Sequence, residues 1–179
     1  KCQEKFLKKM EKYIEPFIGG GAVFFNLQPK NAIINDYNEE LINVYQVIKD
    51  NLDELIIDLK KHKNEAEYFY TIRSLDRNGE FKKLSAVQRA SRVIFLNKTC
   101  FNGLYRVNNA GEFNSPFGRY KNPNIVNEPT LKAVNKFLNN NNIEINSGDY
   151  SEILKQTDKK CFVYLDPPYH PISESSNFT

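Results

Sequence analysis

Tyr13-Ile14-Glu15-Pro16-Phe17-Ile18-Gly19-Gly20-Gly21-Ala22-Val23-Phe24 passes from a short strand-like piece through a proline into three glycines and then into an apolar run. This order predicts a strand, a tight glycine turn and a helix over residues 22–27. The pattern returns at once, because residues 32–34 are apolar, end at Asn35-Asp36-Tyr37, and precede helical spacing over residues 39–59. Strands that alternate with helices are typical of a parallel α/β sheet.

The last third of the chain continues this alternation. After a helix candidate at residues 131–138, a strand at 143–145 ends at Ser147-Gly148-Asp149-Tyr150, and a short helix covers 151–154. An apolar strand at 161–165 then stops at Asp166-Pro167-Pro168-Tyr169, since proline cannot donate to a central ladder. The predicted fold class is therefore α/β, a parallel sheet with helices on both faces and ligands at the carboxyl ends of its strands.

The middle of the chain differs in composition and in residue pattern. Residues 60–98 are charged and helix-prone, and apolar residues between 86 and 96 form a stripe on a helix that also carries Arg89 and Arg92. From 100 to 123, glycine, asparagine and proline punctuate short aromatic pieces, which favours a hairpin and a long loop. We expect an insertion that presents a surface.

Composition limits the class of protein. The 179 residues are 40% hydrophobic and 26% charged, which indicates one globular domain, and a net charge of +3 is too small to identify a nucleic-acid binder. Three distant cysteines and two histidines argue against a disulfide framework and against a zinc site, so we expect no metal. No apolar run approaches the roughly 20 residues of a membrane span, which predicts an intracellular protein without membrane contact.

Three carboxylates each follow a predicted strand, namely Asp36, Asp149 and Asp166. In a doubly wound sheet they converge with the glycine turn on one edge, and a carboxylate after the second strand suits ribose hydroxyls. The alternative is that each aspartate caps a helix or stabilises a turn. The glycines lack the dinucleotide and phosphate-loop patterns. S-adenosylmethionine, which carries no phosphate, fits such a turn, although the glycines alone favour a simple tight turn.

The run Asp166-Pro167-Pro168-Tyr169 is more specific. A carboxylate followed by a proline-held backbone carbonyl offers two acceptors for one exocyclic amino group, and the tyrosine offers a stacking face. Accepting both amino hydrogens draws the amine away from its planar, conjugated geometry toward a nucleophilic one. The motif therefore indicates a site for an extruded base, and the alternative is a strand that simply ends in a Pro-Pro turn.

These motifs together resemble the Dam-type (D12 class) DNA adenine-N6 methyltransferases. The resemblance includes the glycine stretch, Asn35-Asp36-Tyr37-Asn38, Ser147-Gly148-Asp149-Tyr150 and the Asp-Pro-Pro-Tyr run. It extends to the middle of the chain through Asn97-Lys98-Thr99-Cys100-Phe101-Asn102-Gly103-Leu104-Tyr105-Arg106-Val107-Asn108 and Gly111-Glu112-Phe113-Asn114-Ser115-Pro116-Phe117-Gly118-Arg119-Tyr120, which look like that family's DNA-recognition hairpin. The fold implied is a Rossmann-like S-adenosylmethionine-dependent methyltransferase sheet with a helical and hairpin insertion.

The resemblance implies a role for each motif. Asp166 and the carbonyl of Pro167 would accept the amino hydrogens of a flipped adenine, with Pro168 and Tyr169 completing the catalytic motif and Tyr169 stacking on the base. The cofactor would be S-adenosylmethionine, its ribose bound by Asp36 and its adenine amino group by Asp149. Further cofactor contacts are expected from Glu15, Pro16, Phe17, Gly19, Gly21, Tyr150 and Asp166.

The partner implied is double-stranded DNA, with GATC as the expected site. Phe101 would wedge into the base stack, and Leu104, Arg106, Asn108 and Pro116 would read the sequence, although the sequence alone favours ordinary hairpin core for Phe101 and Leu104. Arg106 suits bidentate pairing with guanine. Other expected DNA contacts are Arg89, Arg92, Asn97, Asn102, Gly103 and Arg119, while basic residues at 60–63 and 82–83 suit a solvated surface or the phosphate backbone.

The predicted organisation is a catalytic domain of residues 1–59 and 130–179, with a target-recognition domain at 60–129. Family members usually begin with a Trp-x-Gly-Gly-Lys-like segment and continue past the catalytic motif, so the resemblance implies an incomplete domain. The expected setting is the cytoplasm of a prokaryote or a phage-encoded enzyme, with a cognate restriction endonuclease as a partner that makes no direct contact. The alternatives are an RNA base methyltransferase, a DNA-binding remnant without catalysis, and a structural α/β domain.

Overall fold

The computed structural model describes residues 11–167. Its sheet has the strand order β3-β2-β1-β4, and all three pairings are parallel. The strands are β1 (Lys12–Glu15), β2 (Asn31–Asp36), β3 (Asn142–Ser147) and β4 (Cys161–Val163). The predicted α/β class with a parallel sheet is confirmed.

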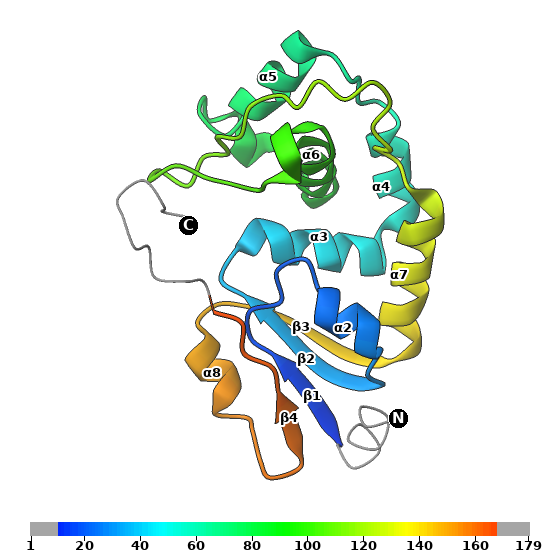
Figure 1. Ribbon diagram of the computed structural model, residues 1–179, viewed down its shortest axis with the longest axis vertical. Coiled ribbons are helices and arrows are strands. Elements are labelled where there is room, and N and C mark those ends of the chain that lie inside the picture. Colours follow the sequence, from blue (N-terminus) through cyan, green and yellow to red (C-terminus); the bar gives the residue numbers. More distant parts are fainter. Residues whose placement is uncertain (1–10, 168–179) are drawn as a thin grey trace.

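Helices cover both faces of this sheet (Figure 1). Because side chains alternate along a strand, Tyr13 and Ile34 point into the main hydrophobic core on one face, whereas Ile14 and Ile33 pack against Ile153 on the other. The helices of the first face are α2 (Ala22–Leu27), α3 (Glu39–Asp50) and α7 (Glu128–Asn140), and that of the second is α8 (Tyr150–Leu154). Burial on both faces explains why the strands read as apolar runs rather than as an alternating pattern.

The predicted helix over residues 39–59 is two helices. Asn38 caps α3 by accepting hydrogen bonds from the backbone of Glu40 and Leu41. At Asn51 the backbone leaves the helical region, with φ −131° and ψ 39°, and a second helix, α4 (Leu52–Leu59), starts there. Asparagine competes with the helical backbone through its own side chain and is favoured at helix ends. The break turns α4 away from the sheet (Figure 1).

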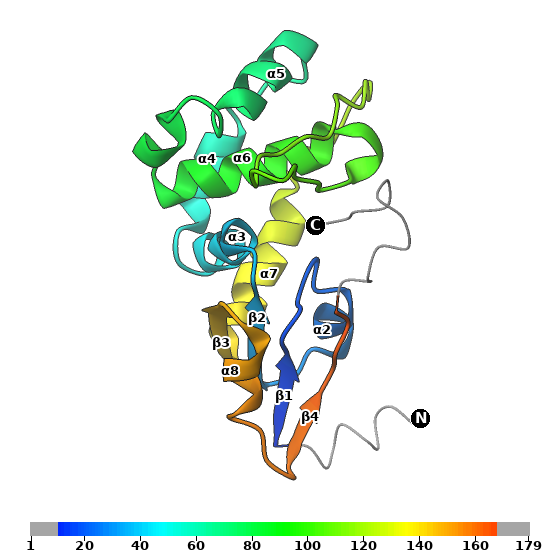
Figure 2. The ribbon, with the colours of Figure 1, turned by 90° about the vertical axis from the view of Figure 1, so that its left-hand side faces the viewer.

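Residues 60–129 form a helical layer beyond α3, on the side away from the sheet (Figure 2). Phe69, Phe95, Leu96, Cys100 and Phe113 bury a core of their own there. Its helices are α5 (Ala66–Ser74), η1 (Glu80–Lys83), α6 (Ala86–Thr99) and η2 (Phe101–Gly103). None of the helices in residues 11–167 is both long enough and apolar enough to cross a membrane.

The hairpin expected after residue 100 is only partly regular. Two isolated antiparallel bridges join Cys100 to Phe117 and Val107 to Phe113. Apart from η2, the rest of this segment is loop, consistent with its glycine, proline and asparagine content. We call residues 100–119 the recognition loop.

Candidate functional site

The glycine turn is tied to the end of the second strand through Asp36. The carboxylate of Asp36 accepts hydrogen bonds from the backbone N–H groups of Gly19 and Asn38, each at 3.0 Å. On the other side of the turn, the Tyr45 hydroxyl donates to the Gly19 carbonyl at 2.9 Å. Asp36 thus stabilises a turn, as the alternative interpretation held, and its carboxylate keeps further acceptor positions for a ligand.

Gly21 closes the turn in a conformation that favours glycine. Its φ is +70°, and a Cβ at this position would lie 2.7 Å from the Tyr45 hydroxyl oxygen. Gly20, by contrast, has open space where a Cβ would stand. The backbone geometry therefore requires glycine at Gly21, whereas Gly20 has room for a side chain.

The ends of three strands are joined by Asn35. Its side-chain amide donates to the carbonyls of Pro16 and Gly148, both at 3.0 Å. Its Oδ1 is buried and accepts no hydrogen bond within residues 11–167. Sequence reasoning missed this residue, although a polar side chain directly before Asp36 in an apolar strand was a signal.

Glu15 is buried beside this junction. It accepts a 2.6 Å hydrogen bond from the Tyr13 hydroxyl. Burial raises the pKa of the Glu15 carboxyl and the negative charge of Asp166 raises it further, against the lowering effect of the Tyr13 hydrogen bond. The buried Glu15 carboxyl therefore binds a proton more readily than an exposed glutamate does.

The third strand brings Asp149 and Tyr150 to the same edge. Asp149 caps α8, with one carboxylate oxygen accepting from Ser151 N at 2.8 Å. Hydrogen bonds from the side chain and from the backbone N–H of Ser151 lower the pKa of the Asp149 carboxyl. The Tyr150 ring lies 5.1 Å from the Phe17 ring, centroid to centroid. The capping alternative therefore holds for Asp149, which directly precedes one member of this aromatic pair.

Asp166 follows the last strand. The ladder between β1 and β4 continues to Tyr164, whose N–H donates to the Ile14 carbonyl at 2.9 Å. Beyond this point Asp166 and Pro167 are exposed at the carboxyl edge. Pro168 and Tyr169, the other half of the predicted catalytic motif, lie outside the described residues.

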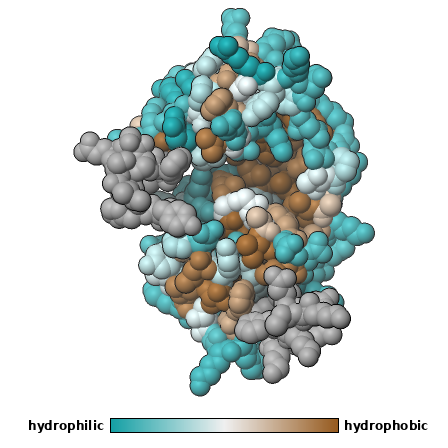
Figure 3. Space-filling view, viewed as in Figure 1, coloured by the Kyte–Doolittle hydropathy of each residue, from teal (hydrophilic) through white to brown (hydrophobic). Residues whose placement is uncertain are grey.

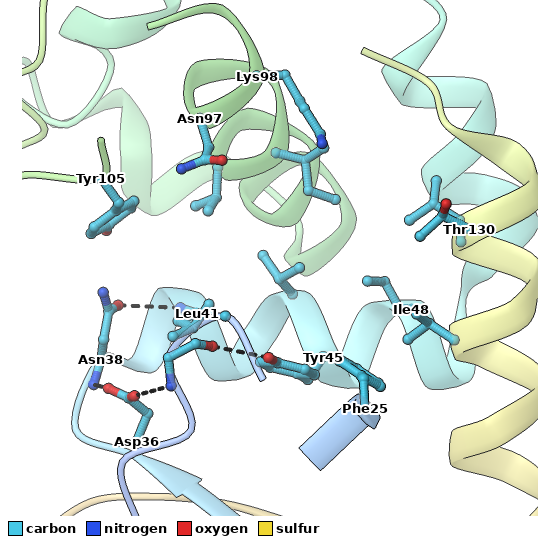
Figure 4. Close-up of a pocket in the computed structure, with 17 residues that line it drawn as sticks. Phe25, Asp36, Asn38, Leu41, Tyr45, Ile48, Asn97, Lys98, Tyr105 and Thr130 are labelled. Carbon is cyan, nitrogen blue, oxygen red and sulfur yellow. Dashed lines mark hydrogen bonds between the residues drawn. The ribbon is translucent and has the colours of Figure 1, made fainter. Parts of the chain in front are cut away.

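A mainly apolar cavity of about 530 Å³ separates the glycine turn from the helical layer. Figure 3 shows brown, apolar side chains gathered in this hollow. Asp36 and Asn38 lie on its sheet side, and Asn97, Lys98 and Tyr105 approach from α6 and the recognition loop (Figure 4). The predicted cofactor edge and the predicted recognition residue Asn97 therefore line the same cavity.

The recognition loop exposes the side chains expected to meet DNA. Phe101 is 53% and Leu104 47% exposed, so the ordinary hairpin core that the sequence alone favoured is wrong for both. Arg106 is also exposed, and its Nε donates to the Asn114 side chain at 2.8 Å. The other expected residues lie within this loop or at its base. The side chain of Asn97 donates to the Gly103 carbonyl at 2.9 Å, and that of Asn108 donates to Glu112 at 2.8 Å. Asn102 and Arg119 have positive φ values of 56° and 55°, and Pro116 is exposed.

Neither expected arginine of α6 is available as a free cation. Arg92 is only 5% exposed and forms a 2.7 Å ion pair with Asp76, so the predicted contact with the DNA backbone does not fit its position. Arg89 is paired with the carboxylate of Glu40 on α3. Helical spacing showed which residues share a face of α6, whereas it could not show that carboxylates on other elements meet them.

His62 forms a polar contact between α4, α5 and α6. Its ring nitrogens lie 3.0 Å from the Tyr68 hydroxyl and 3.0 Å from the Ser91 hydroxyl, and its ring stacks on Phe95. Burial lowers the pKa of His62 from 6.5 to about 4. The folded protein therefore holds this imidazole neutral.

The pKa of His62 predicts an acid-sensitive stability. Between pH 6.5 and about 4 the unfolded chain binds the proton more readily than the folded chain, so the free energy of unfolding should fall as pH decreases through this range and change little above it. Urea unfolding at pH 7 and pH 5 measures the effect. His62→Gln should reduce the pH dependence, and an identical dependence in wild type and variant would contradict the assignment.

Comparison with known proteins agrees with this geometry. A model of the D12 class N6 adenine-specific DNA methyltransferase family matches residues 2–179. The chain is 49% identical to "Type II methyltransferase M1.LlaDCHI" of Lactococcus lactis subsp. cremoris, over 96% of this chain and 61% of that protein. It is 45% identical to "Type II methyltransferase M.MjaIII" of Methanocaldococcus jannaschii, over 95% of this chain and 62% of the relative.

A more distant relative has a different printed name. The "DNA adenine methylase" of Escherichia coli K12 is 35% identical over 98% of this chain and 62% of its own length. The chain thus spans somewhat less than two thirds of the length of each of these three relatives. Because the family model covers nearly every residue, the chain belongs to the D12 class of N6 adenine-specific DNA methyltransferases.

Proposed function

We propose that this chain forms the cofactor edge and the DNA-reading surface of a site-specific DNA adenine-N6 methyltransferase. The observation that carries the proposal is the placement of Asp36, Asp149 and Asp166 at or just after the carboxyl ends of three strands of one parallel sheet, with Asp36 in a cavity that Tyr105 of the recognition loop also lines. Ligands of parallel sheets bind at this edge. The names of the relatives support the same activity.

The residues at this edge fit S-adenosylmethionine, whose sulfonium supplies an electrophilic methyl group. Asp36 is oriented by two backbone amides and would accept from ribose hydroxyls. The Asp149 carboxylate would accept from an adenine amino group, with Phe17 and Tyr150 as apolar contacts. The glycine turn brings backbone close to the ligand without a phosphate-binding pattern. Pro16 and Glu15, both buried behind the turn, would hold its shape rather than touch solvent.

Asp166 and Pro167 would hold the target amine. Two acceptors, one carboxylate oxygen and one backbone carbonyl, would receive the two N–H groups of an adenine taken out of the duplex. These hydrogen bonds stabilise positive charge that develops on the nitrogen as it accepts a methyl group. The exposure of Asp166 and Pro167 beyond β4 leaves room for a base to enter. Pro168 and Tyr169 complete this proposed base site by resemblance.

The recognition loop would read the duplex. Phe101, an exposed phenylalanine in η2 at the start of the loop, suits insertion between bases, as in proteins that kink or open DNA with apolar wedges. We assign sequence reading to Leu104, Arg106, Asn108 and Pro116, with GATC as the proposed site. Arg119, Asn102 and Gly103 would contact the backbone nearby. A restriction-modification setting, with an endonuclease that cuts the same site, is supported by the type II names of two relatives.

Arg106→Ala should relax discrimination at one base pair by about 1–3 kcal/mol, because a guanidinium reads guanine through two parallel hydrogen bonds. The measurement compares dissociation constants for a GATC duplex and for duplexes with a single substituted pair. Lys121→Ala, which removes a neighbouring positive charge outside the loop, is the control for simple loss of charge. Equal discrimination by Arg106→Ala and wild type would exclude the assignment.

The proposed function is tested by methyl transfer. Radiolabelled S-adenosylmethionine is incubated with the chain and with a GATC duplex, a duplex without GATC, and an RNA duplex of the same sequence. Label released as N6-methyladenine from the GATC duplex alone is the expected result. Label on RNA only would favour an RNA base methyltransferase, and specific DNA binding without any cofactor binding would favour a non-catalytic DNA-binding protein.

A further inference from the structure

Both backbone groups of Phe113 attach the recognition loop to the helical layer. Phe113 lies opposite Val107 in an antiparallel bridge, and the ladder hydrogen bonds on either side join Asn108 to Glu112 and Asn114 to Arg106, each at 2.8 Å. In such a pair the N–H and C=O of Phe113 point away from its partner strand. They are therefore free to bond with another element.

Two consecutive side chains take the place of a neighbouring strand. The carboxylate of Asp76 accepts from Phe113 N at 2.8 Å, and Arg77 Nη2 donates to the Phe113 carbonyl at 2.6 Å. Both backbone groups of Phe113 form hydrogen bonds in this way, while its ring is buried in the core of the helical layer, with Phe69 and Phe95. The loop cannot shift along this contact without breaking both hydrogen bonds.

Asp76 is in turn held by Arg92 of α6. The guanidinium of Arg92 donates to Asp76 at 2.7 Å, to the Ile72 carbonyl at 2.9 Å and to the Arg73 carbonyl at 2.7 Å. The last two acceptors belong to the final turn of α5. One buried arginine thus joins α5, α6 and, through Asp76, the recognition loop.

The contact lies one residue from the hydrogen-bond partner of Arg106, a predicted reading position. Asn114, which follows Phe113, accepts a hydrogen bond from Arg106 Nε at 2.8 Å. Arg73 Nη1 also donates to the Ser115 carbonyl, at 3.2 Å. Displacement of Phe113 would therefore move the partner that orients the Arg106 guanidinium.

We propose that Asp76 and Arg92 are positioning residues that determine how sharply the recognition loop discriminates between base sequences, an inference that rests on the proposed function. They contact no base and no phosphate. Arg92 acts on DNA through Asp76 and Phe113. Removal of Asp76 leaves Arg92 buried without a carboxylate partner, whereas removal of Arg92 leaves Asp76 with Arg77, which donates to its other carboxylate oxygen at 2.9 Å.

This role and a phosphate contact by Arg92 predict opposite results. Asp76→Asn keeps the shape of the side chain but offers an amide to Arg92, so discrimination between a GATC duplex and a singly substituted duplex should fall about tenfold, with an unchanged dependence of affinity on salt. Arg92→Gln should behave in the same way. A phosphate contact by Arg92 would instead lower the salt slope by about 1 with discrimination unchanged, and that result overturns the proposal.

Glu80→Gln is the matched control for Asp76→Asn. It removes a carboxylate from the same segment, where Glu80 pairs with Lys83 on the surface without touching the recognition loop. The control should discriminate as wild type does. Equal losses in Glu80→Gln and Asp76→Asn would show a general charge effect and overturn the proposal.

Amide hydrogen exchange of the free protein separates this inference from the proposed function. In Asp76→Asn, exchange should accelerate over residues 104–116 and stay unchanged in the sheet, and cofactor titration should match wild type. Unchanged exchange over 104–116 overturns the positioning role whatever the DNA results are. If wild type does not discriminate between duplexes, the proposed function fails, and accelerated exchange still supports the attachment of the loop by Asp76.

Discussion

Asp166→Ala is expected to lower the rate of methyl transfer by at least about 100-fold, the loss typical when one preorganised hydrogen-bonding group is removed from a developing charge. The carboxylate lies exposed beyond β4, where it can reach an incoming amine. Affinity for duplex DNA should change little, because the recognition loop is remote in sequence and attached elsewhere. The single-turnover rate on a GATC duplex is the quantity to measure.

Glu152→Gln is the control for this substitution. Glu152 lies on α8 and forms an exposed pair with Lys155, so its loss changes the charge but not the proposed amine site. The single-turnover rate of Asp166→Asn should lie between those of Asp166→Ala and Glu152→Gln, since asparagine keeps an acceptor without the negative charge. A single-turnover rate in Asp166→Ala within threefold of wild type would remove Asp166 from the proposed base site.

Gly21→Ala is expected to destabilise the fold by about 2–4 kcal/mol, combining the cost of a left-handed backbone with overpacking. The φ of +70° disfavours any side chain, and the added Cβ would approach the Tyr45 hydroxyl and the Phe25 ring. Movement of Tyr45 would also disturb its hydrogen bond to the Gly19 carbonyl. Urea unfolding measures the loss.

Gly20→Ala is its matched control. A Cβ at Gly20 would meet no atom within 4 Å, and its φ lies outside the left-handed region. We expect a change in the free energy of unfolding below about 1 kcal/mol. Equal stability of the two variants would show that the turn rearranges at no cost and would contradict the geometry at Gly21.

The sheet was predictable because its signals are local. Apolar pieces that end in Asp36, Asp149 and Asp166, each followed by a turn or helix, require only short-range patterns to be read as parallel strands. The break at Asn51 escaped prediction, since apolar spacing continues across it and only the backbone shows the change of direction. The placement of Pro168 and Tyr169 stays a prediction.

Site residues could be predicted from the residue pattern only where a carboxylate directly follows a predicted strand. The resemblance, not periodicity, pointed to exposed Phe101 and Leu104, since an apolar residue in a hairpin is more simply assigned to the core. Arg92 was misplaced because its partner Asp76 is 16 residues away, outside any helical repeat. Long-range pairs of this kind depend on how elements pack, and one sequence does not display them.

The two backbone hydrogen bonds to Asp36 have a thermodynamic consequence for ligand affinity. Immobilising a mobile side chain on binding costs about 0.5–1.5 kcal/mol of entropy. The amides of Gly19 and Asn38 already restrict the Asp36 carboxylate in the free protein. That entropy is lost during folding, so a ribose that binds Asp36 gains its hydrogen bonds without freezing the carboxylate.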